Sequence, residues 1–179
     1  NKTIVSVSYG GTPMTLVKGQ ESHDGATGAY ASLWRLLSPA TGANDVVVTG
    51  SSSGVVISGA ISFTGNHATV PDVQSVSNKG TTGATTVTAT GTVSGNYVIA
   101  CACCGSTMGT PTQTASWLKN VNTSDYGNNG AGSYASSAGG NVVMGYSDVG
   151  DGWAIVAVEV GAAAGGGTIL PMMMQHHGG

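Results

Sequence analysis

Residues 3–17 read Thr-Ile-Val-Ser-Val-Ser-Tyr-Gly-Gly-Thr-Pro-Met-Thr-Leu-Val, and this stretch decides the fold class. Apolar and polar residues alternate in its first half, which predicts a half-buried β-strand with Val5, Val7 and Tyr9 on one face. The pair Gly10-Gly11 is a hairpin turn signal. The residues after it form a short return strand, so the chain opens with an antiparallel hairpin.

The same reading extends along the chain, because period-two patterns and β-branched runs recur between Gly, Pro and Asn turns. Further strands are predicted at residues 30–37, 46–48, 55–63, 85–93, 97–103, 141–146 and 153–160. No segment keeps a 3.6-residue apolar period. We therefore expect an all-β protein, an antiparallel, jelly-roll-like β-sandwich. Residues 64–84 and 105–140 are expected to be long connections, and the second is where a ligand site is expected.

Composition narrows the function classes. The 179 residues include only five Lys and Arg and eight Asp and Glu, with a net charge of −3. A nucleic-acid binder that neutralises phosphates is therefore excluded. Hydrophobic residues make up 40% of the chain, which predicts a folded domain rather than a disordered one. No apolar run is long enough to span a bilayer, and the abundance of Thr, Ser and Gly favours an extracellular or cell-surface location.

The chain divides into a sandwich domain at residues 1–160 and a tail at 161–179. The tail begins as a Gly/Ala hinge and continues into an apolar segment with Ile169, Leu170, Met172, Met173 and Met174. Burying such a side chain is worth about 1.5–3 kcal/mol, so the segment needs a surface on its own domain or on a neighbouring copy. These five residues are the candidate assembly residues, and the segment is a candidate inter-subunit donor strand. The N-terminal strand at residues 3–9 is the rival donor.

Catalytic patterns are weak. Residues 50–54 form a Gly-x-Ser-x-Gly sequence, but more strand follows it, whereas a nucleophile elbow needs a helix. His23 and Asp24 have the residue types of a catalytic triad, but their sequence context favours a solvated turn. Glu21 and Glu159 are the two glutamates, and Glu159 is expected at a rim rather than in a site. We expect no enzymatic activity and no cofactor.

Metal binding has two minor candidates. Asp148 and Asp151 resemble an oxygen-ligand loop for calcium, although a plain turn is favoured because calcium takes six to eight oxygens. His176 and His177 follow a Met triplet, as a soft-metal tail would, but adjacent side chains point apart on an extended strand. No metal site is therefore predicted.

The remaining candidates are cysteines, aromatic residues and sequons. Cys101, Cys103 and Cys104 are read as small apolar residues of a buried strand, with a local disulfide as the first alternative and a metal site as the second. Trp117, Tyr126 and Tyr134 could stack on a sugar. Sequons at Asn1 and Asn122 are glycosylation candidates where the source organism glycosylates them.

A resemblance covers most of residues 4–160. The segments at 5–17, 31–42 and 46–49, with Asp-Gly-Trp-Ala-Ile-Val-Ala-Val-Glu-Val at 151–160, resemble a large group of bacterial and metagenomic surface proteins. The resemblance implies a jelly-roll-like sandwich, usually without assigned activity. Members of that group usually have one or two strands before the segment that matches residues 5–17. Their absence here would leave an apolar groove and an unpaired edge, which a strand from another subunit could fill.

Two functions are weighed. The favoured hypothesis is a structural subunit of an extracellular filament or surface appendage, a homopolymer assembled head to tail by strand exchange. The alternative is a carbohydrate-binding or adhesin module of a surface or phage-related fibre, with surface glycans as partners. In the first case the tail enters a neighbour, and in the second it folds back on its own domain.

Overall fold

The computed structural model describes residues 3–22, 29–54, 56–64, 72–105, 108–111, 116–122, 129–147, 151–162 and 170–174. These residues form strands and no helix, so none of the described segments is a helix that could cross a membrane. The strands are β1 (Ile4–Tyr9), β2 (Thr12–Pro13), β3 (Thr15–Glu21), β4 (Tyr30–Arg35), β5 (Val46–Gly50), β6 (Ala60–Thr64), β7 (Asp72–Gly80), β8 (Thr85–Thr92), β9 (Tyr97–Cys104), β10 (Ser116–Asn122), β11 (Asn129–Ser136), β12 (Gly140–Tyr146), β13 (Trp153–Val160) and β14 (Leu170–Met174).

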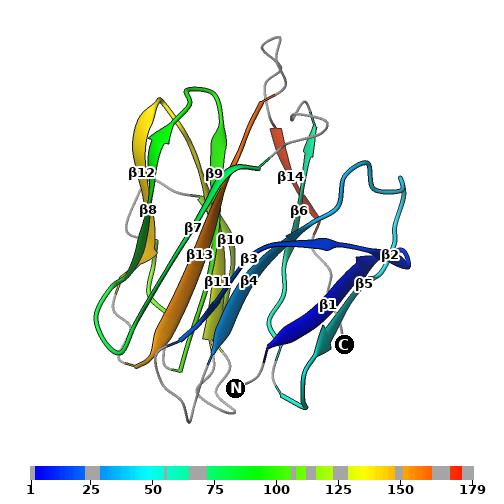
Figure 1. The fold of residues 1–179 in the computed structure, drawn as a ribbon, viewed down its shortest axis with the longest axis horizontal. Helices are drawn as coiled ribbons and strands as arrows, with labels where there is room; N and C mark the ends of the chain where they lie inside the picture. The colour runs from blue at the N-terminus through cyan, green and yellow to red at the C-terminus, as the bar shows by residue number, and fades with distance from the viewer. Residues whose placement is uncertain are drawn as a thin grey trace.

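A five-stranded antiparallel sheet forms the middle of the molecule, in the order β10-β11-β9-β13-β7. The β3–β4 pair and β6 pack on one face, and the β8–β12 pair packs on the other. Figure 1 shows the orange β13 between the green and yellow strands and the blue ones. The predicted all-β antiparallel sandwich is confirmed, while the jelly-roll topology stays a prediction.

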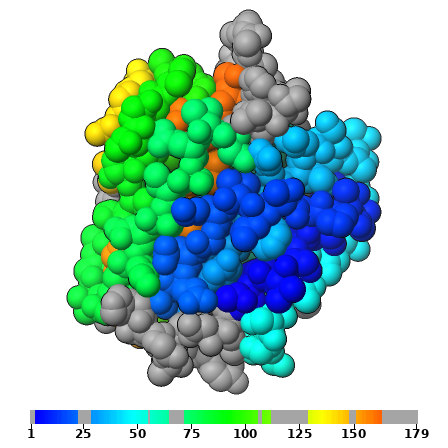
Figure 2. Space-filling view, in the orientation of Figure 1, coloured from blue at the N-terminus to red at the C-terminus, as the bar shows by residue number. Residues whose placement is uncertain are grey.

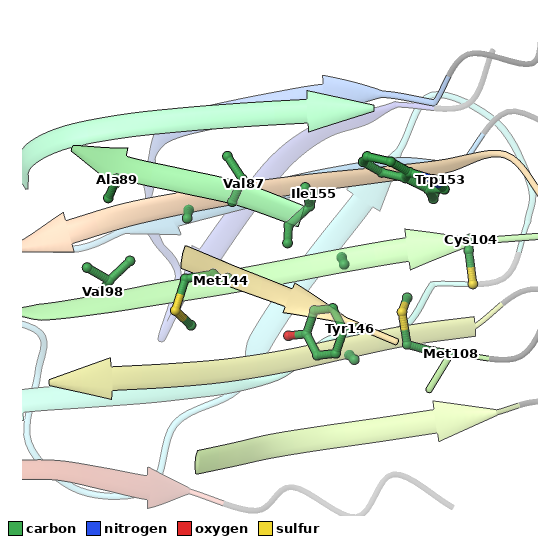
Figure 3. Close-up of a cluster of buried hydrophobic side chains, with 13 residues drawn as sticks. Val87, Ala89, Val98, Cys104, Met108, Met144, Tyr146, Trp153 and Ile155 are labelled. Atoms are coloured by element: carbon green, nitrogen blue, oxygen red, sulfur yellow. The ribbon is translucent and has the colours of Figure 1, made fainter. Parts of the chain in front are cut away.

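Strand β13 is central because its sequence is apolar on both faces. All eight of its residues are buried, as is typical of a strand covered on both sides. Trp153, Ile155 and Ala157 join the cluster under β8 and β12 that Figure 3 shows. Ala154 and Val156 pack on the opposite face, against β4. Accordingly, Figure 2 leaves little of β13 visible between its neighbours.

The two predicted long connections are corrected by the structure. Residues 64–84 contain β7, and residues 105–140 contain β10 and β11. Strand β11 is built almost entirely of Gly, Ala, Ser and Asn, and β7 is mostly polar, so both have few of the β-branched and aromatic residues that mark a strand in sequence. Small residues suit β11 because it lies within the layers, where Ser133 is fully buried.

The opening hairpin is also more irregular than its alternation predicts. Val7 is 7% exposed, whereas Val5 is 60% exposed, although both were expected on one buried face. The pairing of β1 with β5 shifts register between Ile4 and Ser6. A bulge of this kind re-aims the side chain beside it, which accounts for the exposure of Val5.

Candidate assembly site

The tail forms a strand on its own domain in the single chain. Strand β14 pairs antiparallel with β6, with Leu170 opposite Thr64 and Met174 opposite Ala60. Figure 1 shows the red β14 beside β6, at one side of the sandwich. Within the described part of the chain, these two strands form a separate two-stranded sheet. The predicted apolar segment is therefore a strand, and Leu170, Met172, Met173 and Met174 belong to it, whereas Ile169 lies outside the described residues.

Strand β6 is held to the central sheet by its side chains. Ile61 and Phe63 are partly buried and pack against the cluster of Ile99, Val158 and Val160. The Phe63 ring lies 6.2 Å from the Tyr97 ring, centroid to centroid, in a tilted arrangement. The packing of Ile61 and Phe63 holds β6 in place, and the backbone of β6 pairs with β14. In register, Met173 pairs with Ile61 and Pro171 pairs with Phe63.

The start of the tail is anchored by a buried polar network around Glu159. Its Oε2 accepts a hydrogen bond from Gln74 Nε2 at 2.7 Å. Its Oε1 accepts from the Val93 backbone N–H at 2.8 Å and from Asn96 Nδ2 at 2.7 Å. Asn96 Oδ1 in turn accepts from the Ala162 N–H at 3.0 Å. The network therefore links the end of β13 to the first residues of the tail.

The expectation that Glu159 lies at a rim is wrong. Its side chain has no solvent exposure, and two donors from the turn between β8 and β9 and one from β7 cover it. Buried carboxylates need several hydrogen bonds to offset desolvation, and this one has three. Sequence reasoning missed Asn96 and Gln74 entirely. The Ser-Gly-Asn sequence at 94–96 reads as an ordinary turn and carries no signal of a buried amide.

The proposed sugar-stacking residues do not form one loop cluster among the described residues. Tyr134 lies in β11, with its ring 6.1 Å from that of Tyr97, and it packs against the cluster under β6. Trp117 lies in β10, where its register partner is Ser133. Tyr126 is outside the described residues. Tyr134 is thus a packing residue of a strand rather than a loop residue.

The candidate metal and catalytic residues are only partly described. Asp151 Oδ1 accepts a hydrogen bond from the Gly152 N–H at 2.7 Å, as in a plain turn, and Asp148, His176 and His177 lie outside the described residues. Among the residues that are described, no group of three His, Cys, Asp or Glu side chains could hold a metal ion.

Residues 51–53 of the Gly-x-Ser-x-Gly sequence form an exposed bend, and the strand predicted from residue 55 begins only at Ala60, so the described residues 56–59 are irregular and form neither the expected strand nor a helix. Ser51 donates a backbone hydrogen bond to the Thr3 carbonyl and accepts one from the Thr3 N–H on Oγ. Both contacts join the end of β5 to the start of β1. The other two residues of the candidate triad, His23 and Asp24, lie outside the described residues. The sequence therefore joins strands and does not present a nucleophile in the way that an elbow would.

All three cysteines are free thiols. Cys101 and Cys103 contact the β4 side of the sheet, whereas Cys104 is buried in the cluster on the opposite side. The Cys101 thiol donates to the Ser32 carbonyl at 3.3 Å. Burial raises the pKa of Cys101 to about 12 and that of Cys103 even further. Thiols of raised pKa are poor nucleophiles, so these two act as core residues.

The glycosylation candidates are described only in part. Asn122 is the last residue of β10 and pairs with Asn129, and Asn1 lies outside the described residues. The geometry thus offers one feature suited to assembly, a terminal strand on a short edge. No family model matches this chain, and no curated protein or solved structure matches it either.

Proposed function

We propose that this chain is a structural subunit of an extracellular filament or surface appendage, in which β14 of one subunit pairs with β6 of the next. One observation carries the proposal. The apolar terminal strand β14 pairs with a single short strand, and a Gly/Ala-rich segment joins it to the sandwich. A strand attached in this way can make the same pairing within its own chain or with another copy.

The free-energy difference between the two arrangements is small, because exchange preserves the β14–β6 pairing. Both forms keep the same backbone hydrogen bonds and the same register partners. What differs is the cost of association and the strain of the connecting segment. The eight peptide steps from Ala162 to Leu170 span at most about 29 Å, so the tail can reach a neighbour whose β6 lies within that distance.

Head-to-tail exchange also explains why such an assembly would grow in one direction. Each subunit would offer two different surfaces, its β14 and the edge of its β6, and a contact between unlike surfaces propagates when its rotation does not close. Pro171 lacks a backbone N–H, so it cannot donate to a further strand. A strand with this proline suits the outer position of a sheet, where the ladder ends.

The register supplies a direct test. Ser62 pairs with Met172, so a chain carrying both Ser62→Cys and Met172→Cys should form a disulfide wherever β14 meets β6. Oxidation at increasing protein concentration, followed by non-reducing gel electrophoresis, separates the two arrangements. Pairing between subunits gives a ladder of covalent multimers. Pairing within one chain gives only a monomer of altered mobility.

Two controls make the test specific. A mixture of the Ser62→Cys protein and the Met172→Cys protein should give only cross-linked dimers, and the parent chain reports any reaction of Cys101, Cys103 and Cys104. Deleting residues 166–179 should abolish filaments in electron micrographs. Filaments that persist after the deletion would sink the role of the tail. A monomer-only result at all concentrations would favour the binding-module alternative, with the tail on its own domain.

A further inference from the structure

The network around Glu159 has a property that packing alone does not require. Asn96 is the only residue among its described members that contacts both the buried carboxylate and the tail. Its Nδ2 donates to Glu159 Oε1 at 2.7 Å, and its Oδ1 accepts from the Ala162 N–H at 3.0 Å. Asn96 is 4% exposed, so water does not compete strongly for either bond.

The carboxylate fixes the orientation of the Asn96 amide. With Nδ2 facing Glu159, both contacts are favourable. Rotating the amide by half a turn would place its oxygen against the carboxylate and its NH₂ against the Ala162 N–H, so both contacts would become repulsive. Glu159 Oε1, which also accepts from the Val93 N–H, therefore holds the amide oxygen toward Ala162.

The backbone of Asn96 is rigidly held as well. Its N–H donates to the Val93 carbonyl at 3.2 Å, and its carbonyl accepts from the Ser137 N–H at 2.8 Å. The Gly95 N–H donates to the Ser137 carbonyl at 3.0 Å. The turn between β8 and β9 is thus tied to the segment after β11, and Asn96 is a fixed point from which Ala162 is held.

We infer that Asn96 is a positioning residue that fixes where the connection between the sandwich and β14 begins. Holding Ala162 shortens the hinge to the residues between Ala162 and β14. Short hinges disfavour the return of a segment to its own domain and promote exchange between copies. Asn96 thereby shifts β14 from its own β6 toward that of a neighbour. This inference rests on the proposed exchange of β14.

The test compares Asn96→Ala with Gln74→Ala in the full chain carrying the Ser62→Cys and Met172→Cys pair. Each substitution removes one side-chain donor to Glu159, but only Asn96 contacts Ala162. We expect hydrogen exchange of the Ala162 amide to be about fivefold faster in Asn96→Ala, as the loss of one ordinary hydrogen bond predicts. The intramolecular share of cross-links should rise in the same variant. Gln74→Ala should change neither.

The outcomes separate this inference from the proposed function. Equal Ala162 exchange and equal cross-link shares in the two variants would show that Asn96 only stabilises the fold, and would overturn the inference. If the parent pair gives intramolecular cross-links alone, the proposed function fails, while a selective change in Ala162 exchange still supports the anchor. Asn96→Ser, which keeps a polar group but lacks the amide oxygen, provides the same comparison if Asn96→Ala does not fold.

Discussion

Gly80 shows how a single residue without a side chain allows the core to close. It pairs with Trp153 across β7 and β13, and a Cβ at this position would lie 2.6 Å from the indole ring. The indole is 5% exposed, and its Nε1 donates to the Thr82 carbonyl at 3.3 Å. The ring is therefore held between Gly80 and the Thr82 carbonyl. Moving it aside would break its hydrogen bond and its packing.

We predict that Gly80→Ala lowers the free energy of unfolding by about 1–3 kcal/mol, as overpacking a close-packed site does. Chemical denaturation measures the change. Gly59→Ala is the matched control, because a Cβ at Gly59 would meet nothing within 4 Å, and it should change stability by less than about 0.5 kcal/mol. Equal effects at the two positions would mean that the indole does not limit the site.

The burial of Cys101 makes the stability of the fold depend on pH. Burial raises the pKa of its thiol from 9.0 to about 12, while the same thiol in the unfolded chain ionises near 9.0. The unfolded state therefore loses its proton first, so the contribution of Cys101 to stability is complete below pH 9 and is lost as pH rises from 9 toward 12. Burial also raises the pKa of Cys103 and Tyr146, which act in the same direction.

The prediction is that the free energy of unfolding falls steadily above pH 9, and that Cys101→Ala makes this fall less steep. Equilibrium denaturation at a series of pH values, under reducing conditions, measures both slopes. The variant keeps some slope, because Cys103 and Tyr146 remain. A slope unchanged by the substitution would contradict the assignment of a buried, neutral thiol at this position.

At the scale of strands, the sequence predicts those elements whose side chains face a core. The bounds of β13 agree with the prediction residue for residue, and those of β8 and β9 agree within one residue. Their apolar or alternating patterns carry the information.

Strand β7 was missed because its polar side chains make contacts that only the fold creates. Ser77 bonds Gln20 of β3, and Asn78 Nδ2 donates to the Thr86 carbonyl of β8.

Strand β11 was missed for a different reason. Its small residues are required by close neighbours that lie far away in the sequence. A Cβ at Gly130 would lie 3.1 Å from the Ile57 side chain, and the buried Ser133 hydroxyl lies 2.8 Å from that of Tyr146. No local pattern predicts either neighbour, so the composition of 129–136 reads as a loop.

Phe63, together with Ile61, packs β6 against the central sheet. Its ring packs against Tyr97 and the cluster around Val158. We predict that Phe63→Ala costs about 2 kcal/mol, below the roughly 3–5 kcal/mol of a fully buried phenylalanine, because the side chain is only partly buried. It should also reduce cross-linking in the Ser62→Cys, Met172→Cys chain.

Thr64→Ala is a suitable control for Phe63→Ala, since Thr64 lies on the same strand but is exposed. It should leave stability and cross-linking nearly unchanged. If Phe63→Ala destabilised the domain while cross-linking stayed the same, then β14 would bind a surface other than the edge of β6.

At the scale of the whole molecule, the sequence predicted that the tail needs a surface but not which one. The Ile, Leu and Met residues of the tail carry that requirement in their composition alone. The pairing with β6 and the anchor at Asn96 depend on the fold, which pairs residues 170–174 with 60–64 and brings Asn96 within hydrogen-bond distance of Glu159 and Ala162. Contacts between segments so distant in sequence leave no local signal.

The low charge of the molecule gives the last prediction. Neither β6 (Ala-Ile-Ser-Phe-Thr) nor β14 (Leu-Pro-Met-Met-Met) contains a charged residue. Raising the salt concentration shortens the Debye length from about 10 Å at 0.1 M to about 3 Å at 1 M, but the β14–β6 contact has no charges to screen. The cross-linked ladder of the double-cysteine chain should therefore change by less than about twofold over this range.

Non-specific association should behave differently. It should be greatest near the sequence pI of about 5.6, where the net charge vanishes and copies no longer repel one another. Light scattering across pH, with and without residues 166–179, distinguishes the two processes. The deletion should remove the salt-independent assembly and keep a scattering maximum, moved to a lower pH because His176 and His177 are lost with the tail. A ladder that shrinks severalfold in 1 M salt would instead assign assembly to charged side chains outside the two strands.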